Sequence, residues 1–311
     1  MEFPLAVLYP SAKSPAPRNH RSLKAPSILS QSSAILFPPL LRPPTMLGAS
    51  DRGGSSRRLC AGTASGANGL IAEALHDGGA AALVTAGGYS LVLALDNLAR
   101  RNLIEQSLSR KIVHVLSGIC YMASWPIFSS SSQARYFAAV VPLLNCARLL
   151  FYGLSIATNE GVIKSITREG KPEELLKGPL YYVLTLMFSS LIFWRESPIG
   201  IISLAVMSGG DGFADILGRR YGSRKLPYNK KKSWVGSISM FMFGFIFSSM
   251  MLYYFSALGY LRLDWESTVE KVALVALAAA FMESLPISDA IDDNITVPVT
   301  TMAAAFLVFG Y

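Results

Sequence analysis

Residues 209–222 read GGDGFADILGRRYG, and they directly follow the apolar run PIGIISLAVMS at 198–208. Together the two stretches are long enough to cross a bilayer, for which a helix needs about 20 mostly apolar residues. Two carboxylates, Asp211 and Asp215, nevertheless lie within this segment. Acids next to hydrocarbon are costly and commonly mark a functional site in a membrane protein. The stretch therefore predicts a membrane helix that carries two acids to a site.

The composition of the whole chain also favours a membrane protein. Hydrophobic residues make up 51% of the 311 residues and charged residues only 15%, against about 25% charged in a typical soluble domain. Mean hydropathy is +0.39. We expect an all-α fold, a polytopic transmembrane helical bundle of seven or eight spans. The expected spans are 79–98, 112–128, 137–157, 179–194, 199–218, 235–257, 271–287 and 295–311.

The N-terminal segment has a different character. Residues 1–60 contain ten Ser, nine Pro and almost no acid, and no compact apolar run follows a basic start. This pattern is typical of a transit peptide and fits a secretory signal poorly. We expect 1–60 to be a plastid transit peptide, 61–78 a short linker and 79–311 the membrane domain. A disordered tail without a targeting role is the alternative.

The charges of the connecting loops predict an orientation for the bundle. With eight spans, the odd-numbered loops carry 15 Lys and Arg and the even-numbered loops carry four. Because basic loops stay on the side where the chain is made or imported, the odd loops are expected on one face, the stromal one. All the polar clusters whose residues are suited to catalysis or ligand binding lie on that face, as an enzyme acting on a water-soluble cosubstrate requires.

Asp211 and Asp215 are the strongest candidates for chemistry. Residues four apart on a helix share one face, with Cβ atoms about 5–6 Å apart. A divalent cation would remove their repulsion, and Mg²⁺ prefers one or two carboxylates together with nucleotide phosphates. The neighbouring Gly210 and Gly212 would allow a ligand or another backbone to approach closely. The alternative is a helix-packing stretch whose acids face a water-filled cavity.

A basic loop follows the two acids and contains seven cations in fourteen residues. Cations beside a carboxylate-bound metal suit a triphosphate, because they neutralise charge during phosphoryl transfer. A loop that only sets topology or binds lipid headgroups is the alternative. The candidate nucleotide contacts in and after this loop are Arg219, Arg220, Lys230, Lys231, Lys232 and Gly236.

A third cluster, at 283–294, has four acids and no cation. It could supply a second metal contact, pair with Lys230–Lys232, or form a solvated acidic turn. Asp292 or Asp215 could accept a proton from a substrate hydroxyl. His114, which follows Arg110-Lys111, and Lys177 are further candidates for catalysis and phosphate contact, and a structural role is the alternative for each.

Several other classes of protein are disfavoured. The sequence has no GxxxxGK[ST] loop and no protein-kinase signature set, and no Ser/His/Asp or HExxH arrangement stands out. The net charge of +8 comes mainly from the first 72 residues, so no nucleic-acid partner is implied. The three cysteines form no zinc pattern.

These motifs resemble those of the polyprenol kinase family, and within it the phytol kinases of plants. The acidic and basic motifs are also similar to those of dolichol kinases and, more distantly, of phosphatidate cytidylyltransferases. The chain lacks the Ser-x-x-Lys-Arg and Gly-His-Gly-Gly motifs of the latter. The stretches that carry the resemblance are 106–114, 167–170, 174–179, 210–222, 227–233, 236–237, 283–286 and 292–294.

The resemblance implies a CTP-dependent kinase of phytol whose product feeds tocopherol synthesis. Together with the two acids and the N-terminal segment, we expect Mg²⁺ as cofactor and phosphorylation of phytol within the lipid bilayer of a plastid. The choice of CTP comes from the resemblance alone. A farnesol or geranylgeraniol kinase, a membrane cytidylyltransferase and a transporter are the alternatives.

Overall fold

The computed structural model describes residues 61–157, 161, 163, 166–167, 169–286 and 291–310. Within this part of the chain the structure is helical and contains no β-strand, apart from one isolated bridge between Lys225 and Ser233. The all-α prediction is therefore confirmed. The proposed transit peptide, residues 1–60, and Asp289 lie outside the described residues.

The helices follow the predicted apolar runs, except that the first helix begins at Ala61 and so includes residues 61–78, which were expected to form a short linker. The long ones are α1 (Ala61–Arg100), α2 (Gln106–Ala123), α3 (Ala134–Gly153), α5 (Gly178–Ile192), α8 (Trp234–Ala257), α9 (Trp265–Ser284) and α10 (Asp293–Phe309). Shorter elements are α6 (Pro198–Ala205), α7 (Gly212–Tyr221), two short 3₁₀ helices, η1 (Trp125–Ile127) and η2 (Pro172–Leu176), and one π-helical segment, η3 (Val206–Asp211).

Five helical segments among the described residues are long and apolar enough to cross a membrane. α10 is apolar but shorter, at 17 residues. α2 begins with polar and basic residues, and α9 carries three charged residues in its first two turns, which lowers the apolar content of both. The five candidate spans are Gly69–Arg100, Ala134–Gly153, Pro172–Ile192, Pro198–Tyr221 and Trp234–Ala257.

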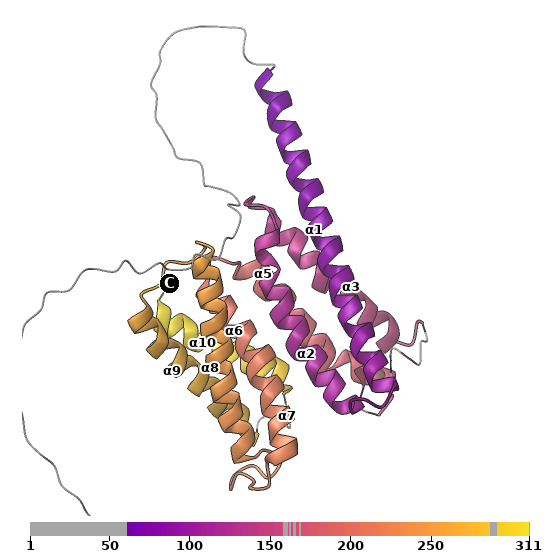
Figure 1. Ribbon diagram of the computed structural model, residues 1–311, viewed down its shortest axis with the longest axis vertical. Helices are drawn as coiled ribbons and strands as arrows, with labels where there is room; N and C mark the ends of the chain where they lie inside the picture. The colour runs from indigo at the N-terminus through magenta and orange to yellow at the C-terminus, as the bar shows by residue number, and fades with distance from the viewer. Residues whose placement is uncertain are drawn as a thin grey trace, which may run out of the picture. The chain divides into compact units, whose positions relative to one another are not determined.

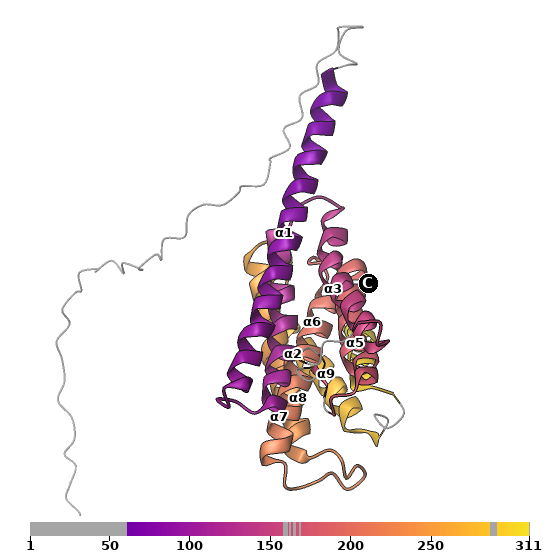
Figure 2. The ribbon, with the colours of Figure 1, turned by 90° about the vertical axis from the view of Figure 1, so that its right-hand side faces the viewer.

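The segment Pro198–Tyr221 is the central helix of the bundle. Its most apolar window is 83% buried, against 17% for that of Gly69–Arg100, so α1 lies at the periphery. The central helix contacts α2, α5, α8 and α10, while α1 packs against α2 and α3 (Figure 1). Figure 2 shows α7 and the loop that follows it at one end of the bundle.

The central helix is α-helical at both ends and π-helical over Val206–Asp211. Every residue of this π segment is buried. A π segment inside an α-helix widens one turn and is often found at functional sites. Here it ends at Asp211, the first of the two acids.

Glycines in and after the π segment let neighbouring helices approach. A Cβ on Gly210 would lie 3.1 Å from the sulfur of Met240 and 3.2 Å from Cα of Gly244, both on α8. A Cβ on Gly212 would overlap Cγ2 of Val115 on α2. Close approach of another backbone is therefore observed at Gly210, whereas at Gly212 the neighbours are the side chains of Val115 and His114.

A polar anchor holds the end of the bundle away from α7. Arg195 is only 2% exposed, and its guanidinium donates to the carbonyl oxygens of Trp125, Phe128 and Ser129 at 3.2, 3.0 and 2.7 Å. A buried guanidinium is tolerated when its donors are satisfied in this way. The anchor fixes the turn between α2 and α3 against the turn between α5 and α6.

Candidate active site

A cavity of about 1370 Å³ opens between α1, α2, α3, α5 and the central helix. At one end, side chains from all the polar clusters predicted from the sequence line it. The described residues of these clusters therefore meet at one site, while their placement on the stromal face of the membrane stays a prediction. The charged or polar residues at this end are Arg110, Lys111, His114, Glu174, Lys177, Asp211, Asp215, Arg219, Lys225, Lys231, Lys232, Glu283, Asp292, Asp293 and Asn294.

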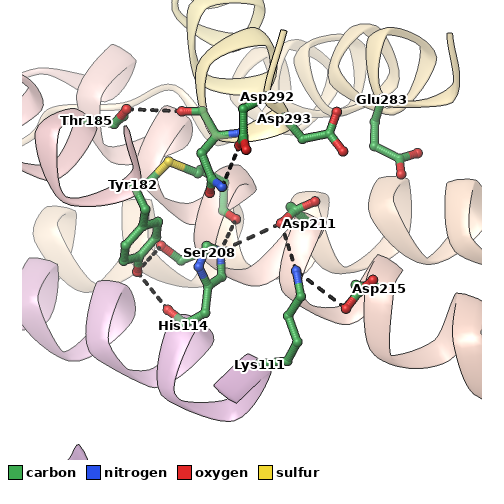
Figure 3. A network of polar contacts seen from close by, with 12 residues as sticks. Lys111, His114, Tyr182, Thr185, Ser208, Asp211, Asp215, Glu283, Asp292 and Asp293 are labelled. Atoms are coloured by element: carbon green, nitrogen blue, oxygen red, sulfur yellow. Dashed lines mark hydrogen bonds and ion pairs between the residues drawn. The ribbon is translucent and has the colours of Figure 1, made fainter. Parts of the chain in front are cut away.

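Asp211 and Asp215 converge on a single cation, the ammonium of Lys111 (Figure 3). Its Nζ lies 3.6 Å from Oδ2 of Asp211 and 3.5 Å from Oδ2 of Asp215. Asp215 also accepts a hydrogen bond from Nε of Arg219 at 2.7 Å. Asp211 is the more buried of the two, with 8% of its surface exposed. The two acids therefore lie on the same face of the helix, as their spacing predicts, and both contact the ammonium of Lys111.

His114 lies beside the same acids, one turn along α2 from Lys111. Its Nε2 is 3.7 Å from Oδ2 of Asp211 and 3.2 Å from the carbonyl oxygen of Met207 in the π segment. The hydroxyl of Tyr182 donates to the carbonyl oxygen of His114 at 2.7 Å, and the two ring centroids lie 4.0 Å apart with the ring planes tilted by 38°. The imidazole is thus held in place by α5 and the π segment.

A second ion cluster lines the same end of the cavity. Nζ of Lys232 lies 2.5 Å from Oε1 of Glu283 and 2.8 Å from Oδ2 of Asp293. Burial lowers the pKa of Lys232, but the two carboxylates outweigh this and hold it above its ordinary value, so the ammonium is charged at neutral pH. Of the options left open for the acidic stretch, pairing with the lysine run is observed for Lys232.

Asp292 is the N-cap of α10. Its Oδ1 accepts hydrogen bonds from the backbone N and from Nδ2 of Asn294, at 2.9 and 2.8 Å. Its other oxygen, Oδ2, lies against Gly178 at the start of α5, where an added Cβ would be 3.2 Å away. A capping carboxylate satisfies amide groups that the first helical turn leaves unpaired. The cap therefore orients Oδ2 toward α5 and the cavity.

The basic loop is ordered by contacts with the end of α9. The side chain of Leu226 is 2% exposed. Asn229 donates from Nδ2 to the carbonyl oxygen of Ser284 at 3.1 Å, and the hydroxyl of Tyr228 donates to Oγ of Ser284 at 2.9 Å. Lys225 and Ser233 close the loop with the isolated bridge. The loop thus presents Lys225 and Lys231 to the cavity.

Not all of the predicted nucleotide contacts line the cavity. Gly210 and Gly212 pack helices together, and Arg220 stacks over the ring of Tyr221. Lys230 is exposed. These four residues are absent from the cavity wall. Gly236 does line it, where α8 passes close to Gly218 of α7.

Two oxygen atoms at the charged end of the cavity are suited to binding a divalent cation. Oε2 of Glu283 is buried without a hydrogen-bond partner, as is Oδ1 of Asn294. Both are oxygen ligands of the type that Mg²⁺ takes. Among the described residues, no three acid, His or Cys side chains form a complete metal site by themselves. Phosphate or water oxygens would complete the coordination, as is usual for Mg²⁺ in phosphoryl-transfer sites.

Two side chains of the candidate site have no role predicted from the sequence. One is Lys111, although its spacing of three residues from His114 places both on one face of a helix. The other is Tyr182, which lies in an apolar run of α5. The sequence does not predict a role in the site for it, because a tyrosine in such a run is usually a core residue. Its hydroxyl interacts with Ser117 and Ser208 from two other helices, at 3.4 and 3.3 Å.

Comparison with known proteins identifies close relatives in plants. The chain is 65% identical over 238 residues to "Probable phytol kinase 1, chloroplastic" of Oryza sativa subsp. japonica, covering 76% of each chain. It is 61% identical over 237 residues to "Phytol kinase 1, chloroplastic" of Arabidopsis thaliana, covering 76% of this chain and 78% of the relative. It is 46% identical over 212 residues to "Farnesol kinase, chloroplastic" of Arabidopsis thaliana, covering 68% and 69%. No family model and no solved structure matches the chain.

Proposed function

The chain belongs to the phytol kinase family of plants, and we propose that it transfers the γ-phosphoryl group of CTP to the hydroxyl of phytol, a long-chain isoprenoid alcohol, in a plastid membrane. The products are CDP and phytyl phosphate, and the phosphate feeds tocopherol synthesis. One observation carries the proposal: a single cavity joins two ion clusters and a basic loop to an apolar interior. An enzyme that brings a nucleotide from water to an alcohol in lipid needs such a connection.

The triphosphate lies at the charged end of the cavity. Arg219, Lys225 and Lys231 line this end from α7 and the basic loop, where they neutralise phosphate oxygens. Lys177 reaches the same space from the start of α5. Lys232 acts indirectly, because its contacts with Glu283 and Asp293 hold the loop in place.

Asp211 and Asp215 would hold Mg²⁺, and Glu283 Oε2 and Asn294 Oδ1, both buried without a hydrogen-bond partner, are the further oxygen atoms that line the same cavity. A metal ion held there would supply positive charge to the phosphates during transfer. Lys111 would then exchange its contact with the two aspartates for one with a phosphate oxygen. His114 supports Asp211 from the other side at 3.7 Å.

The hydroxyl of the alcohol approaches from the apolar side. Oδ2 of Asp292 is the group that we assign to accept its proton, because Oδ1 is already engaged by Asn294. Asp215 is less suited, since Lys111 and Arg219 both stabilise its charged form. Catalysis then consists of positioning and charge neutralisation without a covalent intermediate.

The test uses the full-length protein purified in detergent with γ-labelled CTP, Mg²⁺ and phytol. We expect labelled phytyl phosphate and CDP, and a loss of roughly a hundredfold or more in kcat for Asp211→Asn or Asp215→Asn, the scale of losing an electrostatic contact to the transition state. The matched control is Asp264→Asn, an exposed acid at the start of α9.

The same assay separates the competing functions. Release of pyrophosphate with transfer of the cytidylyl group would identify a cytidylyltransferase instead. Higher kcat/KM for farnesol or geranylgeraniol than for phytol would change the substrate but keep the reaction. Wild-type turnover in Asp211→Asn or Asp215→Asn would remove the metal assignment.

A further inference from the structure

The cavity has a second arm that the charged end does not explain. It extends away from the two ion clusters between α1, α2, α3 and α5. Apolar and small side chains from all four helices line it, among them Leu83, Val92, Cys120, Pro142 and Leu186. We refer to this part as the apolar arm.

The apolar arm is long. Along α2 the lining residues begin near Lys111 and continue to Ser124, a separation of thirteen residues that corresponds to about 20 Å at 1.5 Å per residue. On α1 the lining extends back to Leu83, in the opposite chain direction. The arm is therefore deep enough for an extended hydrocarbon chain and much deeper than a nucleotide base would need.

Arg148 marks the junction between the arm and the charged end. It lies five residues, or about 7.5 Å along α3, from Gly153, which packs against Leu176 just before Lys177. It lines the cavity, and its Nε is buried without a hydrogen-bond partner. A guanidinium within the membrane at this junction can interact with the polar end of a ligand whose apolar part lies in the arm.

One wall of the arm is open. Gly87 and Gly88 on α1 line the cavity, and a Cβ built on either would meet no atom within 4 Å. Both are exposed on a peripheral helix, at the level of the apolar bilayer that the spans imply. A chain dissolved in the membrane can therefore reach the arm sideways between α1 and its neighbours.

We propose that the apolar arm holds the isoprenoid tail of the alcohol, and that the space at Gly87 and Gly88 decides how much tail is accepted. The inference rests on the proposed function for the identity of the alcohol. The apolar arm is continuous with the charged end of the cavity. The ligand that fits both parts has a polar group at one end and a single apolar chain for the rest. A nucleotide lacks the apolar part, and a phospholipid has two chains and a larger headgroup.

The first experiment fills the open wall. Gly87→Leu and Gly88→Leu add bulk where no atom interferes with folding, and the matched control is Gly79→Leu, an equally open glycine of α1 that does not line the cavity. All three changes replace glycine by a better helix former. We expect the ratio of kcat/KM for geraniol to that for phytol to rise at least tenfold in the two arm variants, with the KM for CTP unchanged.

The control should keep the wild-type ratio. If Gly87→Leu and Gly88→Leu also keep it, the arm does not hold the tail and the inference is overturned. If the wild-type protein phosphorylates no alcohol of the series, the proposed function fails instead, and the two failures are thereby distinguished.

The second experiment does not depend on turnover. Cys120 is an exposed free thiol that lines the arm, whereas Cys146 is buried and does not. In a Cys60→Ser background, phytol should slow the alkylation of Cys120 by N-ethylmaleimide several-fold, and CTP alone should not. Equal protection by hexadecane, which has no hydroxyl, would show a non-specific lipid groove and would overturn the inference, as would no protection by phytol.

Discussion

At the scale of single residues, the decisive contact is the ammonium of Lys111 between two carboxylates. Asp211 and Asp215 are on one helix turn, and without a cation their charges would repel each other in a site shielded from water. Lys111 comes from a different helix, α2, and its side chain is 22% exposed. Under the proposed function Mg²⁺ would occupy the same position, so Lys111 and the metal would compete for the two acids.

We therefore predict that Lys111→Gln lowers the thermal midpoint in Mg²⁺-free detergent by several degrees, because removing one partner of a buried pair leaves charge uncompensated. Mg²⁺ should raise the midpoint of this variant more than that of the wild type. Thermal unfolding followed by intrinsic fluorescence, with and without Mg²⁺, measures both effects.

The control is Lys171→Gln, which removes an exposed lysine paired with Glu169 at 2.6 Å. Exposed pairs contribute little to stability, so this variant should match the wild type. An equal Mg²⁺ response in wild type and Lys111→Gln would contradict metal binding at the two aspartates.

Sequence reasoning located the acids but not their immediate partners. The spacing of Asp211 and Asp215 fixes a shared helix face, because the helical period is a local property. Which cation faces them depends on how α2 crosses the central helix, and no local pattern encodes that crossing. The same is true of Lys232, whose partners Glu283 and Asp293 are more than fifty residues away in the sequence.

At the scale of elements, the crossing of α2 and the central helix depends on one small contact. Gly212 begins α7, and an added Cβ there would overlap Cγ2 of Val115, with the next nearest atom 3.6 Å away. Because Lys111 and His114 lie one turn or less from Val115, any separation of the helices moves both away from the acids.

Gly212→Ala should accordingly destabilise the protein by about 1–3 kcal/mol, the usual cost of overpacking, and should reduce kinase activity. Adding Val115→Ala removes the obstructing methyl groups and should restore both properties in large part. Denaturant unfolding and kinase assays of the two single variants and the double variant test this; a double variant no better than Gly212→Ala would contradict the proposed contact.

The basic loop is a second element whose order has a specific cause. Lys232 joins it to α9 and α10 through two carboxylates. Lys232→Met should therefore increase the rate of tryptic cleavage after Arg224, Lys225 or Lys231 by several-fold. Lys230→Met, which changes an exposed lysine of the same loop, is the control and should leave cleavage at these three residues unchanged. Equal rates for the two variants would contradict the anchor.

Gly222, Pro227 and Asn229 break helices, so the sequence alone is enough to predict a loop in this segment. It did not predict that the loop is folded back on α9, since Leu226 and Asn229 become buried only through long-range contacts. The π segment was also missed, because an extra residue in a turn leaves the apolar pattern of Pro198–Tyr221 nearly unchanged.

At the scale of the whole molecule, α8 carries the chain from the charged end of the cavity to the opposite end of the bundle. Single cysteines in a background without native cysteines should report this arrangement. Ser223→Cys and Ile291→Cys should react with a membrane-impermeant maleimide from the same side, and Arg262→Cys, between α8 and α9, from the other. Labelling of Ser223→Cys and Ile291→Cys from opposite sides would exclude a shared site.

The number of spans was harder to predict than the fold class. Apolar runs identify helices well because lipid requires every backbone group to be paired within the helix. Length and composition qualify five of the segments as spans in the described part of the chain. α2, α9 and α10 were also expected to cross the membrane. Part of α2 and of α9 consists of charged residues, and several of these line the cavity.

The open wall at Gly87 and Gly88 makes the concentration of alcohol in the bilayer, and not in water, the one that controls the rate. A substrate that arrives sideways from lipid is sampled by two-dimensional diffusion, so the rate should follow the mole fraction of alcohol in the bilayer. Adding inert lipid at constant total alcohol would then slow turnover, although nothing in the aqueous phase has changed.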